Sequence, residues 1–260
     1  MRPWSECPEQ DLKHIRGLCF DIDGTFTTQG KVTAEAFAML WSLHQAGYKL
    51  IPITGRAAGH GDLMLRFWPV DAVISESGAL IYYVQDGKRQ TLVADEKAWH
   101  SPQIMQELLP SFKAKFSEAQ LALDQDFRQY DLAIDIGEGV SPWSPGRIQE
   151  ALAFIQQAGF QASASSVHIN IWRGDISKPG MFAKWMQQQG QKLDLTEWIY
   201  LGDAANDAAA FAFFQQTVAV ANFKKYQDQV KTLPQYITTQ EMGMGFREVG
   251  ARLLAARNRP

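Results

Sequence analysis

The sequence predicts an α/β protein, a Rossmann-like doubly wound parallel sheet with an inserted α+β cap domain. Apolar strand patterns alternate with helical patterns up to about residue 80 and again after Gly174, which is typical of a parallel sheet covered on both faces. Between these stretches, hairpin signals and helices indicate a separate α+β unit. We therefore expect a core made of residues 1–82 and 177–260, with a cap over residues 83–176.

The first part of the core carries three strand patterns. The apolar segment 17–22 predicts a buried strand that ends in an Asp-Gly turn, and residues 34–46 carry apolar side chains at helical spacing. Residues 48–53 and 71–75 predict two more strands, with an amphipathic stretch near 63–67 between them. This order places the strand ends along one edge of the sheet.

The cap begins with a hairpin signal, because residues 79–84 and 91–94 flank the dipeptide Asp86-Gly87, which is typical of tight turns. Further patterns predict helices at 96–116 and 145–158 and strands at 120–123, 132–136, 160–165 and 167–172.

The α/β alternation then returns, and residues 242–245 are expected to form a loop before the last helix. The predicted elements are helices at 179–189 and 206–214, a helix near Lys224, a terminal helix, and strands at 198–202, 217–220 and 235–238.

Composition and charge limit the class of partner. Hydrophobic residues make up 46% of the chain and the formal charge is -3. Lysine and arginine form no run that would follow a phosphate backbone or an anionic lipid surface, so we expect neither nucleic acid nor a membrane as partner. The polar N-terminus and the absence of a long apolar stretch favour a cytoplasmic protein. Cys7 and Cys19 match neither a disulfide framework nor a zinc site, and the oligomeric state stays open.

Two carboxylates, Asp21 and Asp23, follow the first predicted strand. Side chains at the carboxyl ends of parallel strands converge on one crevice. Two carboxylates held there repel each other unless a cation lies between them or one of them is protonated. A metal-assisted nucleophile beside a general acid satisfies both conditions, so we predict Asp21 as the nucleophile and Asp23 as the acid.

The next two residues suit a bound anion. Gly24 permits a sharp turn that brings backbone N–H groups near a ligand, and Thr25 adds a hydroxyl, so both are predicted to bind substrate. A calcium loop is excluded, because a loop counted from Asp21 has Phe26 where Gly is required and Val32 where a bidentate Glu is required. Taken alone, an acidic turn at a strand end explains these residues equally well.

Thr54, Gly55 and Arg56 follow the second strand at the same edge. We predict that the Thr54 hydroxyl donates to a phosphoryl oxygen and belongs to the catalytic set, and that Gly55 and Arg56 bind substrate. Alone, the segment would be an ordinary turn from strand to helix. Its glycines do not make a nucleotide loop, because no Gly-Lys-Ser/Thr follows and the GxGxxG spacing is absent.

Lys178 opens a helix where the core resumes. A cation there neutralises a carboxylate nucleophile and a transferring phosphoryl group together, so we place Lys178 in the catalytic set. A lone lysine at a helix start is usually solvated, and the assignment therefore depends on what surrounds it.

Oxygen ligands of the kind that magnesium prefers follow the predicted strand before Asp203. We predict a Mg2+ site made by Asp203, Asn206 and Asp207 together with Asp21 and Asp23. Asp203 is the principal ligand among the first three, and the other two orient or support it. Asn206 or Asp207 could also cap the helix that follows.

With the segments DIDGT, TGR, Lys178 and GDAAND in this order, the chain resembles the haloacid dehalogenase (HAD) superfamily of phosphotransferases. The long insert resembles the C2-type cap of subclass IIB. That subclass includes sucrose-phosphate, trehalose-phosphate and mannosyl-phosphoglycerate phosphatases and phosphomannomutase. The resemblance covers the whole chain and is strongest in the core.

The resemblance implies roles that agree with those above. Asp21 would form an aspartyl-phosphate, Asp23 would be the acid/base with its backbone carbonyl on magnesium, Thr54 and Lys178 would bind the phosphate, and Asp203 would ligate the metal. The sequence departs from the family pattern at two positions that carry no catalytic group. The segment that usually reads Asn-Gly-Ala is Ser77-Gly78-Ala79 here, so Ser77 departs from the pattern. Pro179 lies where Gly is usual after the lysine.

The cap sequence offers candidates for recognition of the leaving group. Arg128 lies among four aspartates in the segment 124–135, and His168 and Asn170 share one face of a strand because side chains alternate with a period of two. Carboxylates, amides and arginine suit sugar hydroxyls, so we predict that Arg128, His168 and Asn170 contact the substrate. The alternative is a solvated charged loop with His168 merely hydrogen-bonded.

We therefore expect a magnesium-dependent phosphatase that hydrolyses a small phosphomonoester, with a sugar phosphate as the preferred substrate class. Two alternatives remain open. One is a phosphomutase of the same fold, although the phosphomannomutases of this architecture carry a different second motif in place of Thr-Gly-Arg. The other is a non-catalytic regulator that binds a phosphorylated ligand, although a binding protein has no use for an acid beside a nucleophile.

Overall fold

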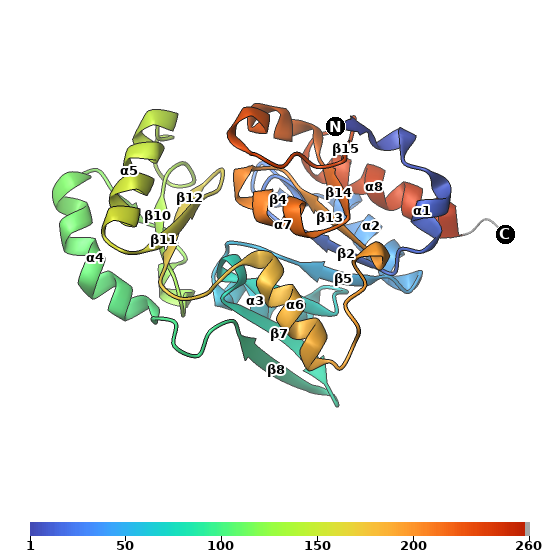
Figure 1. Ribbon diagram of the computed structural model, residues 1–260, viewed down its shortest axis with the longest axis horizontal. Helices are drawn as coiled ribbons and strands as arrows, with labels where there is room; N and C mark the ends of the chain where they lie inside the picture. The colour runs from blue at the N-terminus through green and yellow to red at the C-terminus, as the bar shows by residue number, and fades with distance from the viewer. Residues whose placement is uncertain (258–260) are drawn as a thin grey trace.

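Six parallel strands form the central sheet in the computed structural model, which describes residues 1–257 (Figure 1). The strands are, in spatial order, β1 (Arg2–Pro3), β15 (Tyr236–Ile237), β14 (Gln216–Ala219), β13 (Trp198–Gly202), β2 (Gly17–Phe20) and β5 (Lys49–Pro52). All neighbouring pairs are parallel. The predicted parallel sheet is confirmed, and β2 lies between β13 and β5, so the segments that follow these strands begin side by side.

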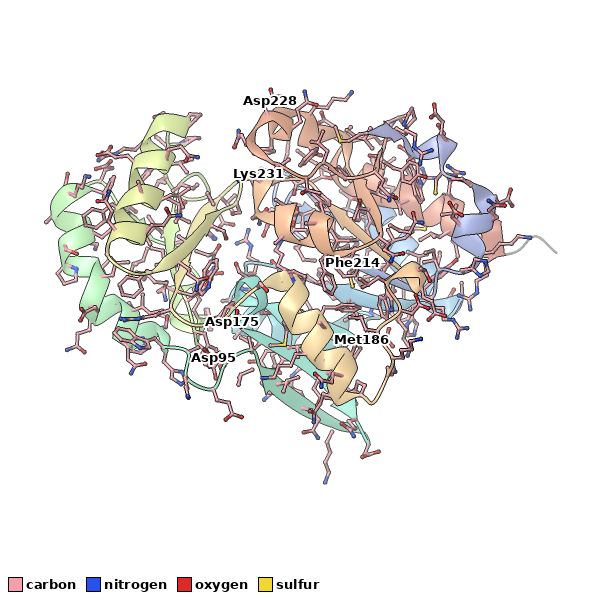
Figure 2. All side chains as sticks on the ribbon, viewed as in Figure 1. Asp95, Asp175, Met186, Phe214, Asp228 and Lys231 are labelled. Carbon is pink, nitrogen blue, oxygen red and sulfur yellow. The ribbon has the colours of Figure 1, made fainter. Side chains whose placement is uncertain are left out.

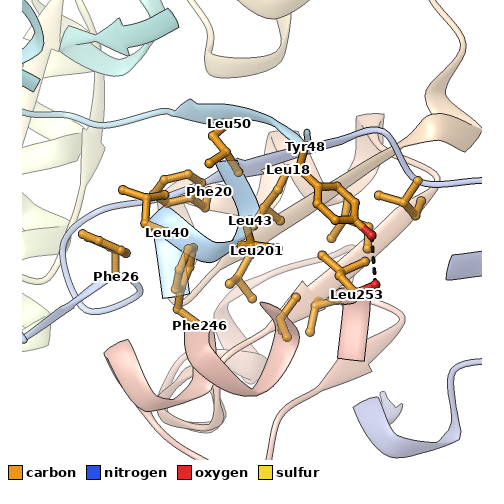
Figure 3. Packing of buried hydrophobic residues seen from close by; sticks show 14 of the residues in the cluster. Leu18, Phe20, Phe26, Leu40, Leu43, Tyr48, Leu50, Leu201, Phe246 and Leu253 are labelled. Atoms are coloured by element: carbon orange, nitrogen blue, oxygen red, sulfur yellow. Dashed lines mark hydrogen bonds between the residues drawn. The ribbon is translucent and has the colours of Figure 1, made fainter. Parts of the chain in front are cut away.

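One face of this sheet is covered by α2 (Ala34–Gln45) and α8 (Met242–Arg257) (Figure 3). Side chains alternate along β2, so Leu18 and Phe20 point to this face, while Cys19 lies in the cluster on the other side. The Tyr48 hydroxyl donates to the Leu253 carbonyl at 2.9 Å, which satisfies a buried polar group inside the cluster. The short helix α1 (Glu9–Lys13) packs against α8.

The opposite face is covered by α6 (Lys178–Gln188) and α7 (Ala208–Phe213). Their buried aromatic side chains Phe182 and Phe211 pack with the sheet residue Tyr200 in one cluster. Helices on both faces explain why the strands are apolar on both sides, as the continuous apolar patterns of the sequence predict.

A second, three-stranded sheet extends the core beyond β5 and consists of β6 (Ala72–Ser75), β7 (Leu80–Gln85) and β8 (Lys88–Val93). A parallel bridge from Ile53 to Ile74 and the backbone hydrogen bonds from Asp71 N–H to the Leu50 carbonyl and from Thr54 N–H to the Ile74 carbonyl join it to β5 and the segment after β5. The hairpin predicted around Asp86-Gly87 is confirmed, since both residues have positive φ, 52° and 70°. The helix α3 (Ala58–Phe67) packs on this sheet.

The antiparallel sheet of the predicted cap has the order β11-β12-β10-β9. Its strands are β9 (Gln120–Leu121), β10 (Leu132–Asp135), β11 (Gln161–Ala164) and β12 (His168–Trp172). The helices α4 (Ser101–Lys115) and α5 (Pro145–Gln157) pack on it through a hydrophobic cluster of their own, separate from those of the large sheet. In Figure 1 this unit lies to the left of the large sheet.

The chain crosses between the two units twice, near Asp95 and near Asp175 (Figure 2). The two crossings lie side by side, because the Asp175 backbone N–H donates to the Asp95 carboxylate at 3.2 Å. The β7–β8 hairpin packs with the core, as Ile81 and Tyr83 belong to the same cluster as α6. The division of the chain at residues 82 and 176 stays a prediction.

Several short elements lie outside the predicted set, because one or two turns leave no periodic signal. These are β1, α1, β3 (Thr27–Thr28), β4 (Lys31–Val32) and the 3-10 turns Trp4–Glu6, Glu76–Gly78, Gln125–Phe127, Leu195–Glu197 and Gln227–Gln229. The helix predicted near Lys224 is the 3-10 turn Ala221–Lys225, and the helix predicted from residue 206 begins as the 3-10 turn Ala205–Asp207. Within residues 1–257, no helix has the length and apolar character needed to cross a bilayer.

The prediction of a loop at residues 242–245 is wrong, because α8 begins at Met242. The Met242 N–H donates to the Asn222 side-chain oxygen at 3.0 Å, which satisfies one of the free amides at the start of the helix. This tertiary contact and the buried Phe246 stabilise a first turn that the two glycines would otherwise disfavour.

Candidate active site

Buried polar residues from three separate segments meet at the carboxyl edge of the central sheet. Asp21 follows β2, Asp203 follows β13, and Lys178 is the first residue of α6. Each is no more than 4% exposed. Parallel strands bring their carboxyl ends to the same edge, which is why segments more than 150 positions apart in the sequence converge here.

Lys178 joins two of the carboxylates. Its Nζ lies 2.7 Å from Asp21 Oδ1 and 2.6 Å from Asp207 Oδ1. Burial, with the carboxylates of Asp207 and Asp23, raises the pKa of Asp21 to about 7, although the Lys178 charge opposes this rise. The prediction that Lys178 faces the nucleophile candidate rather than solvent is consistent with this geometry.

Asp207 is fully engaged by protein donors. The Tyr200 hydroxyl donates to Asp207 Oδ1 at 2.6 Å, and the backbone N–H groups of Asp203 and Ala204 donate to Oδ2 at 2.9 and 3.2 Å. Together with Lys178, these donors use both of its oxygens. Asp207 therefore fixes the turn that carries Asp203, and it also binds Lys178. Because both of its oxygens already accept hydrogen bonds, Asp207 is less available as a metal ligand than its position in the sequence suggests.

Asp203 faces the segment after β2. The Thr25 hydroxyl donates to Asp203 Oδ1 at 3.1 Å, and the Asn222 amide donates to Oδ2 at 2.9 Å and to the Gly24 carbonyl at 3.0 Å. Gly24 has a φ of 79°, and a Cβ there would lie 2.4 Å from Asp203 Oδ2. Only glycine therefore allows the turn to approach this carboxylate so closely.

The donor set fits a divalent cation. Oxygen atoms of Asp21, Asp203 and Asp207 all lie within 4.8 Å of one another, and all three residues are buried. Burial, followed by the repulsion of the Asp21 and Asp207 carboxylates, raises the pKa of Asp203 well above its ordinary value. Lys178 alone cannot balance three buried negative charges, and carboxylates are the ligands that Mg2+ prefers.

Arg56 connects Asp23 to the cap. Its Nε and Nη2 donate to the two Asp23 carboxylate oxygens at 2.9 and 2.7 Å, a bidentate pair. The same guanidinium lies 3.0 and 2.8 Å from the carboxylate oxygens of Glu138 in the cap. The Thr54 hydroxyl oxygen accepts a hydrogen bond from the Arg56 backbone N–H at 3.0 Å.

A cavity of about 350 Å³ lies between the cap and this edge of the sheet. The residues lining it include Asp23, Gly24, Arg56 and Asp203 from the core, and its cap side is made by Gly137, Glu138, Ser166 and Val167. Glu138 is the charged residue that the cap presents to this cavity.

The cap residues predicted to contact the substrate do not line the cavity. The Arg128 side chain is completely buried, and its donors are taken by Asp124, Asp131 and the Gly55 carbonyl. Asn170 donates to the same carbonyl at 3.0 Å and to Asp131 at 2.7 Å. Direct contact of these two residues with the substrate therefore stays a prediction, and in this arrangement a ligand would first have to displace buried ion pairs.

His168 is also buried, and its Nε2 lies 3.0 Å from the Glu138 carboxylate. His168 therefore contacts Glu138, which lines the cavity, but is not itself a lining residue. Asn206 borders a second cavity between α5, β11 and the segment after β13, and its buried side-chain oxygen has no hydrogen-bond partner among residues 1–257, so its role as a metal ligand stays a prediction.

Sequence reasoning missed Glu138, Ser166, Asn222, Lys225 and Tyr226 at the site. Glu138 lies in a glycine-flanked turn without a periodic signal, and Asn222 lies in the 3-10 turn where a helix near Lys224 is predicted. The sequence gives no indication that these turns face the DIDGT segment, because only the folded chain brings them there.

Replacing Glu138 with glutamine should destabilise the protein in a pH-dependent way. The adjacent His168 and Arg56 lower the pKa of Glu138 from 4.5 to about 2. Because the folded-state pKa lies below the unfolded one, this stabilisation is present above pH 4.5 and is lost as the pH falls toward 2. Denaturant unfolding of wild type and Glu138→Gln should show a stability gap that shrinks over this range. A gap that is constant with pH would contradict the prediction.

No protein-family model matches the chain. Among curated proteins, phosphoglycolate phosphatase 1 of Saccharolobus solfataricus is 22% identical over 245 residues, covering 92% of this chain and 96% of that protein. The alignment therefore extends over nearly the whole of both chains.

Two solved structures illustrate the likeness in fold. The HAD subclass IIB sugar phosphatase BT4131 is 16% identical, with 91% of this chain and 96% of that chain covered and a TM-score of 0.62. The sucrose-phosphatase of Synechocystis sp. PCC6803, solved with sucrose and phosphate, is 14% identical, covers 93% and 98%, and has a TM-score of 0.64. Each likeness covers more than 90% of this chain and therefore extends over both the large sheet and the smaller unit.

Proposed function

We propose that this chain, which has the fold of the HAD subclass IIB hydrolases, is a magnesium-dependent phosphatase that hydrolyses a small phosphomonoester through an aspartyl-phosphate on Asp21. The observation that carries the proposal is the buried cluster in which Lys178 touches Asp21 and Asp207, with Asp203 alongside. A protein pays a large desolvation cost to bury three carboxylates around one lysine, and such clusters occur mainly where chemistry needs them.

Asp21 is suited to act as the nucleophile. One of its oxygens accepts from Lys178, which fixes the orientation of the carboxylate. In the first step an Asp21 oxygen bonds to phosphorus while the bond from phosphorus to the leaving oxygen breaks. Lys178 lies beside the carboxylate, where its charge offsets the negative charge of the phosphoryl group during transfer. Water then hydrolyses the aspartyl-phosphate and restores the Asp21 carboxylate.

Asp23 is the proposed acid and base, two positions further along the same turn. Asp23 lines the cavity, whereas the buried Asp21 is not among the lining residues. Asp23 gives a proton to the leaving alcohol in the first step and takes one from water in the second. Both of its oxygens accept from Arg56, so Asp23 must exchange one of these bonds for the leaving oxygen when it acts.

Mg2+ is the proposed cofactor, held by Asp21 and Asp203 with Asp23 at the edge of the site. When bound, it would neutralise the phosphate oxygens and allow two anions, nucleophile and substrate, to approach each other. Thr25 and Asn222 hold the Asp203 carboxylate in place for this role. Chelation should therefore abolish turnover, and added magnesium should restore it.

A sugar phosphate is the proposed substrate class. The cap side of the cavity offers the Glu138 carboxylate and the Ser166 hydroxyl, which can accept hydrogen bonds from sugar hydroxyls. The similar structure solved with sucrose and phosphate supports this class, and the curated relative named for phosphoglycolate supports a smaller acidic ester as a competitor.

The test is release of inorganic phosphate from sugar phosphates, phosphoglycolate and an aryl phosphate, each with magnesium and with a chelator. Release that requires magnesium is the expected result, and the ratio of kcat/KM values identifies the leaving group. Transfer of phosphate between positions of a sugar without release would indicate a phosphomutase. Binding of phosphorylated compounds with neither outcome would indicate the non-catalytic regulator.

A further inference from the structure

The segment Thr54–Gly55–Arg56 is held from the cap side through the carbonyl oxygen of Gly55. Arg128 Nη1 donates to this oxygen at 2.9 Å and Asn170 Nδ2 donates to it at 3.0 Å. Both side chains belong to the cap, and both are buried. A Cβ at position 55 would lie 3.0 Å from Asn170 Oδ1, so glycine is what lets the cap come this close.

The carboxylate of the core residue Glu76 accepts hydrogen bonds from the cap. It is fully buried, and it accepts backbone N–H groups from Gln129 at 2.8 Å, Tyr130 at 2.7 Å and Asp131 at 3.1 Å. Its fourth donor is the N–H of Ala58, at the start of α3 and 2.9 Å away. A single side chain from the core therefore satisfies three successive amides of the cap.

The turn that carries Glu76 also supports the other side of the same loop. The Glu76 N–H donates to the Arg56 carbonyl at 3.0 Å, and the Ser77 N–H donates to the Thr54 carbonyl at 3.0 Å. Both turn residues adopt the left-handed backbone, with φ of 49° and 58°. The carbonyls of three successive loop residues, including Gly55, are thus all bonded, two from the core and one from the cap.

The cap contact is directional because it is made of buried charges. Arg128 pairs with Asp124 at 2.9 Å and with Asp131 at 2.9 Å, and its side chain has no exposed surface. Asn170 reaches Asp131 as well, at 2.7 Å. Leaving any one of these groups without a partner in the interior costs more than the bond itself, so the network favours one arrangement of cap on loop.

We infer that Arg128, Asn170 and Glu76 are positioning residues that lock the cap onto the loop Thr54–Arg56 and so set where Arg56 and Thr54 lie in the site. The lock acts on the loop backbone, while Glu138 holds the Arg56 side chain from the same cap. The loop is thus placed by the cap at two points. The inference concerns the loop itself and holds whichever ligand the site binds.

The test compares Asn170→Ala with Gln125→Ala. Asn170 bonds across to the core, whereas the buried Gln125 side chain, within residues 1–257, bonds to the cap residues Ser101, Asp131 and Ala133. Hydrogen exchange of the core amides of Glu76 and Ser77 reports the loop directly. Asn170→Ala should speed this exchange by about tenfold, the equivalent of one lost hydrogen bond. Gln125→Ala should leave it unchanged.

Unchanged exchange at these two amides in folded Asn170→Ala would overturn the inference, as would an equal acceleration in Gln125→Ala. If Asn170→Ala does not fold, the nearly isosteric Glu76→Gln replaces it, with the Ser77 amide as the reporter. With an aryl phosphate as substrate, Asn170→Ala should also raise KM several-fold. A wild type without turnover would count against the proposed function, while the exchange result would still decide the inference.

Discussion

Replacing Asp21 with asparagine should reduce phosphate release by at least about a thousandfold, because an amide cannot attack phosphorus as a carboxylate does. The side chains have nearly the same shape, and Lys178 can still donate to the amide oxygen that replaces Asp21 Oδ1. The folded structure should therefore persist. Phosphate release under saturating magnesium, with circular dichroism to verify folding, measures the effect.

A matched control for Asp21→Asn is Asp62→Asn. Asp62 lies on α3, away from the site, and pairs with Arg66 and Arg89 at the surface. Exposed pairs contribute little, so this variant should retain turnover within about twofold. Retained turnover in folded Asp21→Asn would refute the aspartyl-phosphate mechanism, whereas equal losses in both variants would point to a general effect on the protein.

Replacing Lys178 with methionine should destabilise the magnesium-free protein by about 3–5 kcal/mol, because the buried carboxylates of Asp21 and Asp207 lose their shared cation. Methionine preserves much of the volume, so the loss comes from charge rather than packing. Turnover should also disappear, since the charge that offsets the transferring phosphoryl group is gone. Urea unfolding in the presence of a chelator measures the change in the free energy of unfolding.

Lys184 provides the control on the same helix. Its Nζ donates to the carbonyls of Val93 and Ala94 at 2.9 and 3.0 Å, outside the site. Lys184→Met should lower the free energy of unfolding by about 1 kcal/mol and leave turnover intact. If Lys178→Met were no less stable than Lys184→Met, the buried carboxylates would not depend on the lysine for their charge balance.

The motifs at Asp21, Thr54 and Asp203 could be predicted from the sequence because each follows a strand. The apolar runs before Asp21, Thr54 and Asp203 predict parallel strands, and the carboxyl ends of parallel strands share one edge. The strand order therefore predicts that Asp21 and Asp203 lie close together, whereas Lys178 opens α6 and its place beside them depends on how that helix packs. What the sequence could not indicate is how Asp207 divides its oxygens among four donors, since these come from separate elements.

The cap residues were harder to place, and Arg128 shows why. A sequence shows which residue types form a cluster, but it does not show which of their side chains point to the cavity. In the structure, Arg128 pairs with Asp124 and Asp131 in the interior. The cap residue that lines the cavity is instead Glu138, which lies in a turn without a periodic pattern.

The sequence by itself determined the α/β class, the hairpin and the carboxylate edge, because local periodicity and strand order fix them. Only the tertiary structure decided the first turn of α8, which depends on Asn222, and the contact of Arg128 and Asn170 with Gly55. Both are hydrogen bonds between residues distant in the sequence. Such bonds depend on the packing of whole elements, and no local pattern encodes their partners.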